Sequence, residues 1–337
     1  MVTQLGTYDD SLDFGSLNLA KSVGICLGSR LERLQGKKVI FSDEERSLVP
    51  IDGWGTRSSP YCATTITTIA PLMENTIIAS VDSSSIQVAE TEEGALYGVK
   101  CGIALAFGGH SLMHFKIGPI LFYLTEEAAK DSKLDSRLAK LVLLDGDYAK
   151  RLLRVRVERV VQTELSAHLV GSVLLVDGSL RSSIFEDQDN SMAKIAENCT
   201  LYRNKLVGIS KSTKFKILDR ISAPLAKVPS PAFIEVGMVI KSLVRNSIGS
   251  NLLVKFERSS PVLRADVVGN CEESLGRILG NDSVARGYPE TLRLAHHIST
   301  FTATEVTCLK SHILTKYDVT ELATEDIRRT LLSSISV

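Results

Sequence analysis

The stretch LLVDGSL, residues 174–180, constrains the fold more than any other part of the chain. Its apolar run predicts a buried strand, and the Gly-Ser pair after Asp177 predicts that the strand ends in a turn at this carboxylate. A second strand-like run, TIIASVDSSS at 76–85, is predicted to end in the same way at Asp82. The helix-like segment before residue 174 carries Glu158. Three acids on three elements therefore form a candidate metal site.

The order of the predicted elements indicates one type of α/β fold. Three strands with short turn-like connections are expected as an antiparallel meander at 76–88, 95–107 and 112–124. Residues 125–168 are charged and helical, which predicts a crossover helix that leads to a parallel strand at 173–177. The later elements are expected as a helix at 188–202, a strand at 205–209, helix and strand material at 231–244 and 251–268, and a long closing helix at 289–314. The βββ-α-β-α-β order predicts an RNase H-like mixed sheet.

The N-terminal part is expected to lie outside this core. Residues 11–35 have the apolar spacing of a helix, and residues 36–60 are polar with Gly and Pro, which predicts a loop. We therefore expect an N-terminal helix and loop extension at 1–70 and an RNase H-like domain with a C-terminal extension at 71–337.

Charge and cysteine usage exclude several classes of protein. The 39 basic and 39 acidic side chains cancel, so a polyanionic partner must meet a local basic patch rather than a global field. The six cysteines form no C-x-x-C pair, which argues against a zinc knuckle or a disulfide framework and favours reduced thiols. The sequence contains neither a signal-peptide pattern nor an apolar run of membrane length. We therefore expect a soluble, cytoplasmic protein without a membrane partner.

The helix that carries Glu158 has a polar stripe at spacings of three and four: Asp147, Arg151, Arg154, Glu158 and Gln162. Glu158 flanks the apolar side of this helix, and Arg154 lies one turn before it, where it is placed to hold the carboxylate or a phosphate. An ordinary solvated helix face is the competing interpretation. Glu164 lies nearer the apolar side and is the alternative ligand.

The two strand aspartates also have a structural interpretation, since Asp-Gly and Asp-Ser-Ser are common turn and cap sequences. The similar LVLLDGDY at 141–148 is better explained as a helix start, with Asp147 as the N-cap. Asp82 and Asp177 differ because neighbouring strands bring their ends together. Carboxylates assembled in this way repel one another, and a divalent cation is the usual compensation. Oxygen ligands favour Mg²⁺ or Mn²⁺ over zinc.

Two further groups of residues are candidates for the chemistry. Gly-Tyr-Pro predicts a helix that starts near Tyr288, with His296 two turns further on nearly the same face. A histidine beside a carboxylate site can ligate a metal or transfer a proton, although a buried, hydrogen-bonded histidine is the more ordinary role. Lys211 and Lys214, which follow the strand 205–209, are candidates for phosphate contacts, or else solvated.

Taken in order, these segments resemble the archaeal NurA nucleases. The resemblance is carried by SVDSSS at 80–85, Glu158 on its helix, LLVDGSL, LVGISKSTK at 206–214 and GYPETLRLAHH at 287–297, and it covers about residues 76 to 312. It implies an RNase H-like fold and Mn²⁺-stimulated cleavage of DNA, with 5′-to-3′ exonuclease and single-strand endonuclease activity. It also implies a homodimer that acts with the hexameric DNA-translocating ATPase HerA in DNA end resection, as part of repair by homologous recombination.

Carried over residue by residue, the resemblance points to Asp82, Glu158 and Asp177 as metal ligands, with Tyr288 and His296 contributing from the C-terminal segment. One departure is Asp82-Ser83, where family members more often have Asp-Gly. The implied chemistry is two-metal hydrolysis of a phosphodiester. The same acids also suit an RNase H-like enzyme for another nucleic acid, and a non-catalytic scaffold subunit of the translocase is the remaining alternative.

The predicted helix at 11–35 has an apolar face that the nuclease core does not need. We expect this face either to build the homodimer or ATPase interface or to pack back on its own domain. In the first case, nearby basic side chains would lie close to that surface or to the mouth of a DNA channel: Arg30, Arg33, Lys37 and Lys38.

Overall fold

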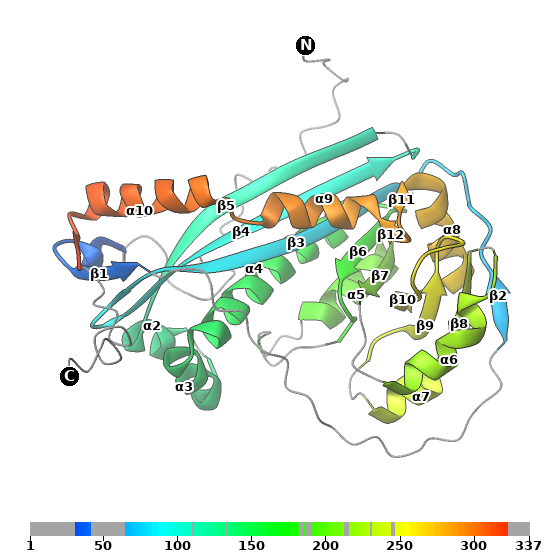
Figure 1. Cartoon of the computed structure of the whole chain (residues 1–337), viewed down its shortest axis with the longest axis horizontal. Helices are drawn as coiled ribbons and strands as arrows, with labels where there is room; N and C mark the ends of the chain where they lie inside the picture. Colours follow the sequence, from blue (N-terminus) through cyan, green and yellow to red (C-terminus); the bar gives the residue numbers. More distant parts are fainter. Residues whose placement is uncertain are drawn as a thin grey trace, which may run out of the picture.

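A computed structural model describes most of the 337-residue chain. The described residues are 31–41, 65–109, 111–132, 134–181, 185, 191–211, 216–229, 231–243 and 247–322. Its central feature is an 11-stranded mixed sheet covered by helices on both faces (Figure 1). The predicted α/β class with a mixed sheet is therefore confirmed. Within the described residues, no helix combines the length and the hydropathy needed to cross a bilayer.

The five strands predicted for the core, which are β3 to β7, occur in the predicted order. The sheet is formed by β1 (Lys38–Phe41), β2 (Ile66–Thr68), β3 (Ile77–Thr91), β4 (Gly94–Phe107), β5 (Ser111–Thr125), β6 (Val173–Asp177), β7 (Lys205–Ser210), β8 (Ala232–Glu235), β9 (Ser250–Lys255), β10 (Leu263–Val268) and β13 (Thr320–Glu321). A separate two-stranded ribbon consists of β11 (Val284–Ala285) and β12 (Tyr288–Pro289). Strands β3, β4 and β5 form the expected antiparallel meander, and β6 is parallel to both β3 and β7.

The helices are η1 (Leu31–Leu34), α2 (Glu126–Asp131), α3 (Ser136–Leu144), α4 (Gly146–His168), α5 (Ser191–Leu201), α6 (Lys216–Ala226), α7 (Gly237–Leu243), α8 (Cys271–Asn281), α9 (Glu290–Ser299) and α10 (Ala303–Tyr317). Helix α4 lies on one side of β3, and α9 lies along β3 and β4 on the other (Figure 1). The two sides are distinguished below as the α4 face and the α9 face.

Strand alternation divides the core between these two faces. Leu174 and Val176 of β6 pack with side chains of α4 and α5, whereas Val173 and Leu175 pack with side chains of α8 and α9. All four side chains are buried, as the uninterrupted apolar run predicts for a central parallel strand. The run thus fixes β6 in the middle of the sheet and brings Asp177 to its end.

Some element boundaries differ from those predicted. The single helix expected at 289–314 is two helices, because Thr302 starts α10 with a capping box that it forms with Glu305. Asp145, rather than Asp147, is the N-cap of α4 and accepts a hydrogen bond from the Asp147 backbone N–H. Tyr288 lies in the short strand β12 and not on a helix, since Pro289 is the N-cap of α9.

The described N-terminal residues belong to the same body as the rest. Leu31 and Leu34 of η1 are buried with Ile313 and Tyr317 of α10, so this end of the predicted helix packs back on its own chain. Residues 38–41, expected as loop, form β1, which pairs with β3 and β13. Arg33 and Lys37 form ion pairs with Glu127 and Glu93, and Lys38 begins β1. Residues 11–30, Arg30 among them, and 42–60 lie outside the described residues.

Candidate active site

The register between β3 and β6 brings the two strand aspartates together. Val81 of β3 is paired with Val176 of β6, so the next residues, Asp82 and Asp177, are neighbours on adjacent parallel strands. The prediction that β3 ends at Asp82 is wrong, because the strand continues through Thr91 by pairing with β4. Strand β6 does end at Asp177. The point where β6 ends beside a continuing β3 is the candidate site.

Asp82 is held by a histidine and by the backbone. Its Oδ2 lies 2.7 Å from Nδ1 of His296 on α9, and its Oδ1 accepts a hydrogen bond of 2.8 Å from the Ser83 backbone N–H. An ionised carboxylate only accepts hydrogen bonds, so the imidazole carries a proton on Nδ1. In the neutral ring this leaves Nε2 with a lone pair, and 59% of the His296 side chain is exposed. The histidine is therefore available to bind a metal ion or a proton.

Asp177 is held by a lysine and a tyrosine. The Lys211 ammonium donates to Oδ2 at 2.8 Å, and the Tyr288 hydroxyl donates to Oδ1 at 3.1 Å. The same ammonium lies 5.2 Å from the centre of the Tyr288 ring. Burial raises the pKa of the Tyr288 hydroxyl, and the negative charge of Asp177 raises it further. Tyr288 therefore remains a hydrogen-bond donor at neutral pH.

Glu158 approaches from α4. Its Oε2 accepts a 2.7 Å hydrogen bond from the Ser83 hydroxyl, and its Oε1 accepts one of 3.1 Å from Gln162. Burial raises the pKa of the Glu158 carboxyl, an effect opposed by Arg159 at 3.6 Å and reinforced by the charge of Asp82. The influence of Asp82 on Glu158 means that the acids from β3 and α4 are electrostatically coupled.

The alternation of β3 explains how the three acids are arranged. Asp82 contacts α9, whereas the next residue, Ser83, contacts α4 through Glu158 and through the Arg154 carbonyl oxygen at 3.3 Å. The two aspartates thus lie on the α9 face, and Glu158 lies on the α4 face. Because β6 ends at Asp177, the sheet does not separate the aspartates from Glu158 beyond this point. Within the described ranges, no three His, Cys, Asp or Glu side chains are arranged to hold a metal ion. Each carboxylate is instead bonded to protein partners.

The donor set nevertheless fits a hard divalent cation. Three carboxylates and an imidazole nitrogen are the ligands that Mn²⁺ and Mg²⁺ accept, with Mn²⁺ the more tolerant of nitrogen. Two of the carboxylates, on Asp82 and Asp177, are neighbours in one sheet, and a third group, Glu158, loses hydration by burial. The present partners of these carboxylates are hydrogen-bond donors that a cation can replace.

The structure distinguishes the two glutamates of α4. Glu164 has 41% of its side chain exposed and lies 3.7 Å from His168, away from the aspartates. Glu158 is the one beside Ser83, with 13% of its side chain exposed. Of the predicted phosphate-binding residues, Lys211 contacts Asp177 and the exposed Arg154 lies one turn before Glu158, whereas Lys214 is outside the described residues.

Sequence reasoning missed Ser83 and Gln162 as partners of Glu158. Gln162 was recognisable from its i+4 position after Glu158. Ser83 was recognisable only with the knowledge that β3 continues, because strand alternation then turns it toward the opposite face from Asp82. Ser83, which replaces the more common glycine at this position, therefore provides a hydroxyl that donates a hydrogen bond to Glu158.

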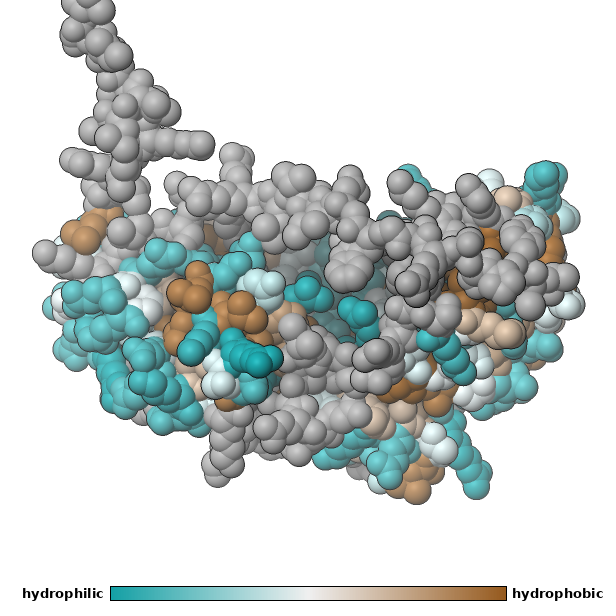
Figure 2. Space-filling model, turned by 90° about the horizontal axis from the view of Figure 1, so that it is seen from below, coloured by the Kyte–Doolittle hydropathy of each residue, from teal (hydrophilic) through white to brown (hydrophobic). Residues whose placement is uncertain are grey.

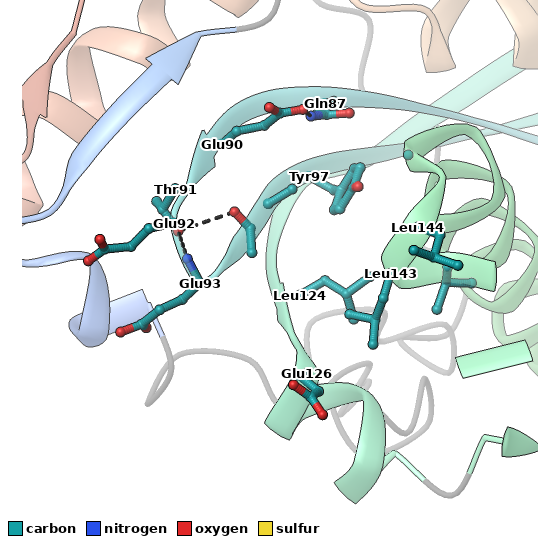
Figure 3. A pocket seen from close by; sticks show the side chains of 14 residues that line it. Gln87, Glu90, Thr91, Glu92, Glu93, Tyr97, Leu124, Glu126, Leu143 and Leu144 are labelled. Atoms are coloured by element: carbon teal, nitrogen blue, oxygen red, sulfur yellow. Dashed lines mark hydrogen bonds between the residues drawn. The ribbon is translucent and has the colours of Figure 1, made fainter. Parts of the chain in front are cut away.

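A separate hollow lies at the far end of β3 and β4. It has a volume of about 500 Å³ and is bordered by the glutamates of the β-hairpin and α2, with Leu124, Leu143 and Leu144 on another side (Figure 3). Leu144 is 85% exposed, and on the side where α3 lies the surface has a hydrophobic patch among hydrophilic residues (Figure 2). None of the candidate site residues lines this hollow.

Comparison with known proteins identifies the class of this α/β domain. The family model for the NurA domain matches residues 76–230, a range that contains Asp82, Glu158, Asp177 and Lys211. Residues 76–230 of the chain are thus similar to the NurA domain, which confirms the resemblance seen in the sequence. No curated protein gives a significant match.

The chain is also similar to solved structures. The NurA nuclease from Sulfolobus solfataricus is 16% identical with a TM-score of 0.49, and the alignment covers 74% of this chain and 88% of that one. A NurA structure bound to dAMP and manganese is 12% identical with a TM-score of 0.45, and the alignment covers 77% of this chain and 91% of that one.

Proposed function

We propose that this chain is a metal-dependent nuclease whose active site is centred on Asp82 and Asp177. The observation that carries the proposal is the parallel register of β3 and β6, which makes these aspartates neighbours inside a NurA domain. Two carboxylates side by side, with a third acid coupled to one of them, are costly unless a cation is bound. Hydrolysis of phosphodiesters is the chemistry that such sites support.

The residues that would hold Mn²⁺, or Mg²⁺ in its place, are Asp82, Asp177, Glu158 and His296. A pair of such ions supplies an activated water and neutralises negative charge on the leaving oxygen. Asp177 is neutralised by Lys211 at 2.8 Å, so the carboxylate would exchange this monovalent cation for a divalent one. Glu158 would gain from the same exchange because burial disfavours its charged form.

The remaining side chains have separate roles in this proposal. Lys211, once released from Asp177, carries a positive charge that can bind the phosphate to be cleaved. Tyr288 stays protonated and donates a hydrogen bond, first to Asp177 and then to a phosphate oxygen. His296 bonds Asp82 through Nδ1 and can take or give a proton at Nε2. Arg154, one turn before Glu158, is a further phosphate contact.

We further propose that the substrate is DNA, as single strands and as duplex ends, with 5′-to-3′ exonuclease and single-strand endonuclease action. In the same proposal, the enzyme acts in the cytoplasm as a homodimer with a HerA-type hexameric translocase in DNA end resection. Support comes from the match of residues 76–230 to the NurA domain and from the motifs around Asp82 and Asp177. The geometry of the acids by itself suits DNA and RNA equally.

A set of cleavage assays tests the proposal. The purified full-length chain is titrated with Mn²⁺ and with Mg²⁺ on labelled single-stranded DNA, duplex DNA and RNA, with the Asp177→Asn variant as the negative control. Cleavage of DNA that requires the metal and Asp177 supports the proposal. Faster cleavage of RNA would reject the DNA assignment. A chain that binds the translocase but neither binds Mn²⁺ nor cuts any substrate would be a scaffold subunit instead.

A further inference from the structure

Three exposed arginines lie at the edge of the candidate site. Arg151, Arg154 and Arg181 are all exposed, and within the described ranges none of them forms an ion pair with a carboxylate. Elsewhere on the surface such pairs are frequent, as with Lys150–Asp147 on the same helix and Arg293–Glu290 on α9. In a chain with equal numbers of acidic and basic residues, three arginines in one place without an ion pair among the described residues need an explanation.

Arg154 and Arg181 lie close enough to Arg151 for their charges to act on its guanidinium group. The pKa of the Arg151 guanidinium is lowered by partial burial and then by the positive charges of Arg154 and Arg181. Like charges held together weaken a folded protein unless an anion binds between them. The cluster therefore has the electrostatics of an anion site.

The position of the cluster relates it to the acids. Arg154 and Arg151 lie one and two turns before Glu158 on α4, and Arg181 lies four residues after Asp177. Two helical turns rise by about 10 Å. That length corresponds to about three nucleotides of a strand at 3.4 Å each. The cluster thus begins beside the candidate site and leads away from it.

The Arg151 side chain and the backbone next to Arg181 are held in place by their surroundings. The Arg151 guanidinium lies 4.9 Å from the centre of the Phe185 ring, which is 2% exposed and is too buried to stack on a nucleotide base. The segment that carries Arg181 is fixed because the Leu180 backbone N–H donates to the buried carboxylate of Asp266 at 3.0 Å. A side chain that is already positioned, as Arg151 is, loses less conformational entropy when it binds a phosphate.

We propose that Arg151, Arg154 and Arg181 bind the sugar-phosphate backbone of the strand that is cut, over about three nucleotides on one side of the cleaved bond. The inference rests on the proposed nuclease function and assigns the path of the substrate strand. Because the contacts are to phosphates, the cluster contributes affinity and register but no sequence preference.

The test measures binding without cleavage. A labelled single-stranded oligonucleotide is titrated in EDTA across a series of salt concentrations with the wild type and the triple variant R151Q/R154Q/R181Q. Loss of three phosphate contacts is expected to reduce the magnitude of the slope by about 2 when the logarithm of the binding constant is plotted against the logarithm of the salt concentration. Binding at low salt is expected to weaken at least about tenfold. The control variant R137Q/K140Q/R258Q removes the same charge from exposed positions elsewhere and should retain the wild-type slope.

The outcomes separate this inference from the nuclease proposal. If the wild type binds and cuts DNA and the triple variant keeps its salt slope, the phosphate path is wrong while the nuclease assignment stands. If the wild type binds the oligonucleotide but cuts nothing with any metal, the nuclease proposal fails. Because Arg151 also packs on Phe185, the double variant R154Q/R181Q carries the test should the triple variant fold poorly. For that variant the expected flattening is about 1.4.

Discussion

Two faces of the sheet meet at Asp82 and Ser83, and they hold their acids differently. On the α9 face, the carboxylates of Asp82 and Asp177 bond to an imidazole and to an ammonium group at 2.7 and 2.8 Å. On the α4 face, the neutral Ser83 and Gln162 donate hydrogen bonds to Glu158, and the cationic Arg159 lies farther away, at 3.6 Å. The difference indicates that the aspartates define the position of the site, whereas Glu158 adds a buried charge that an arriving cation stabilises.

The α9 face also contains a buried anchor. Ser80 lies two residues before Asp82 and donates to Thr291 at 2.7 Å, and Thr291 donates to the buried Asp282 at 2.6 Å. This chain of hydrogen bonds fixes the start of α9 on β3, and α9 carries His296. On the α4 face, hydroxyl groups link β3 to the helix: Ser85 donates to the Lys150 carbonyl oxygen at 3.0 Å, and Ser83 donates to Glu158.

The largest expected effect is on the aspartates. Asp177→Asn removes a charge that the metal ions require, so we expect the rate at saturating Mn²⁺ to fall at least about a thousandfold, or about 4 kcal/mol of transition-state stabilisation. Asp82→Asn should behave in the same way. Initial rates on a labelled oligonucleotide measure the loss, and circular dichroism confirms folding. A near wild-type rate for either variant would mean that the site is wrongly assigned.

A second effect, about a hundredfold, is expected for the helical acid. Glu158→Gln keeps an oxygen that can accept a hydrogen bond from the Ser83 hydroxyl, but it removes the buried charge. Both the cleavage rate and the affinity for Mn²⁺ should therefore fall. Glu164→Gln is the matched control, because that side chain is 41% exposed and lies beside His168. If Glu164→Gln were the more damaging change, the helical ligand would have to be reassigned.

Local patterns were sufficient to predict the strands that carry the aspartates. The apolar run ending at Val176 predicted β6 at its observed limits, 173–177, and the βββ-α-β-α-β order placed it parallel to β3. These features depend on the periodicity and length of short segments, which a sequence contains explicitly. The prediction of Glu158 on a helix came from the same kind of information.

Contacts between distant residues could not be predicted in this way. The continuation of β3 beyond Asp82 depends on pairing with β4, and this continuation turns Ser83 toward Glu158. Thr291 and Ser80 are separated by 211 positions, so no spacing rule relates them. The interruption between α9 and α10 follows from the capping box at Thr302, which competed with a continuous apolar pattern.

The third expected effect concerns the stability of the buried anchor. Burial raises the pKa of Asp282 from 3.8 to about 6, and one of its oxygens, Oδ1, has no hydrogen-bond partner among the described residues. The folded state therefore binds the proton more tightly than the unfolded state. The stabilisation that protonated Asp282 provides is fully present below about pH 4 and is lost as the pH rises to about 6. Over this range the loss amounts to at most about 3 kcal/mol.

Asp282→Asn should remove this dependence of stability on pH, because the amide is neutral and its oxygen can still accept a hydrogen bond from the Thr291 hydroxyl. The free energy of unfolding, measured by denaturant titration, should thus improve relative to the wild type as the pH rises from about 4 to about 6. Asp318→Asn, at an exposed helix C-cap, is the control and should show no such trend. A constant difference between Asp282→Asn and the wild type would show that the carboxyl is not protonated in this range.

The smallest effect is expected where the α4 face joins the site. Ser83→Ala removes the hydroxyl that donates to Glu158 at 2.7 Å, so the carboxylate loses one of its fixed positions without losing its charge. A hydrogen bond to a charged group contributes about 1.5 kcal/mol, which corresponds to about a tenfold change. We expect the rate at saturating Mn²⁺ to fall by this factor, with partial recovery in Ser83→Thr, whose hydroxyl can donate again. A double-mutant cycle with Glu158→Gln measures the coupling directly. If Ser83→Ala slowed the Glu158→Gln enzyme as much as the wild type, the hydroxyl would act independently of Glu158, and the two faces would not be coupled through this contact.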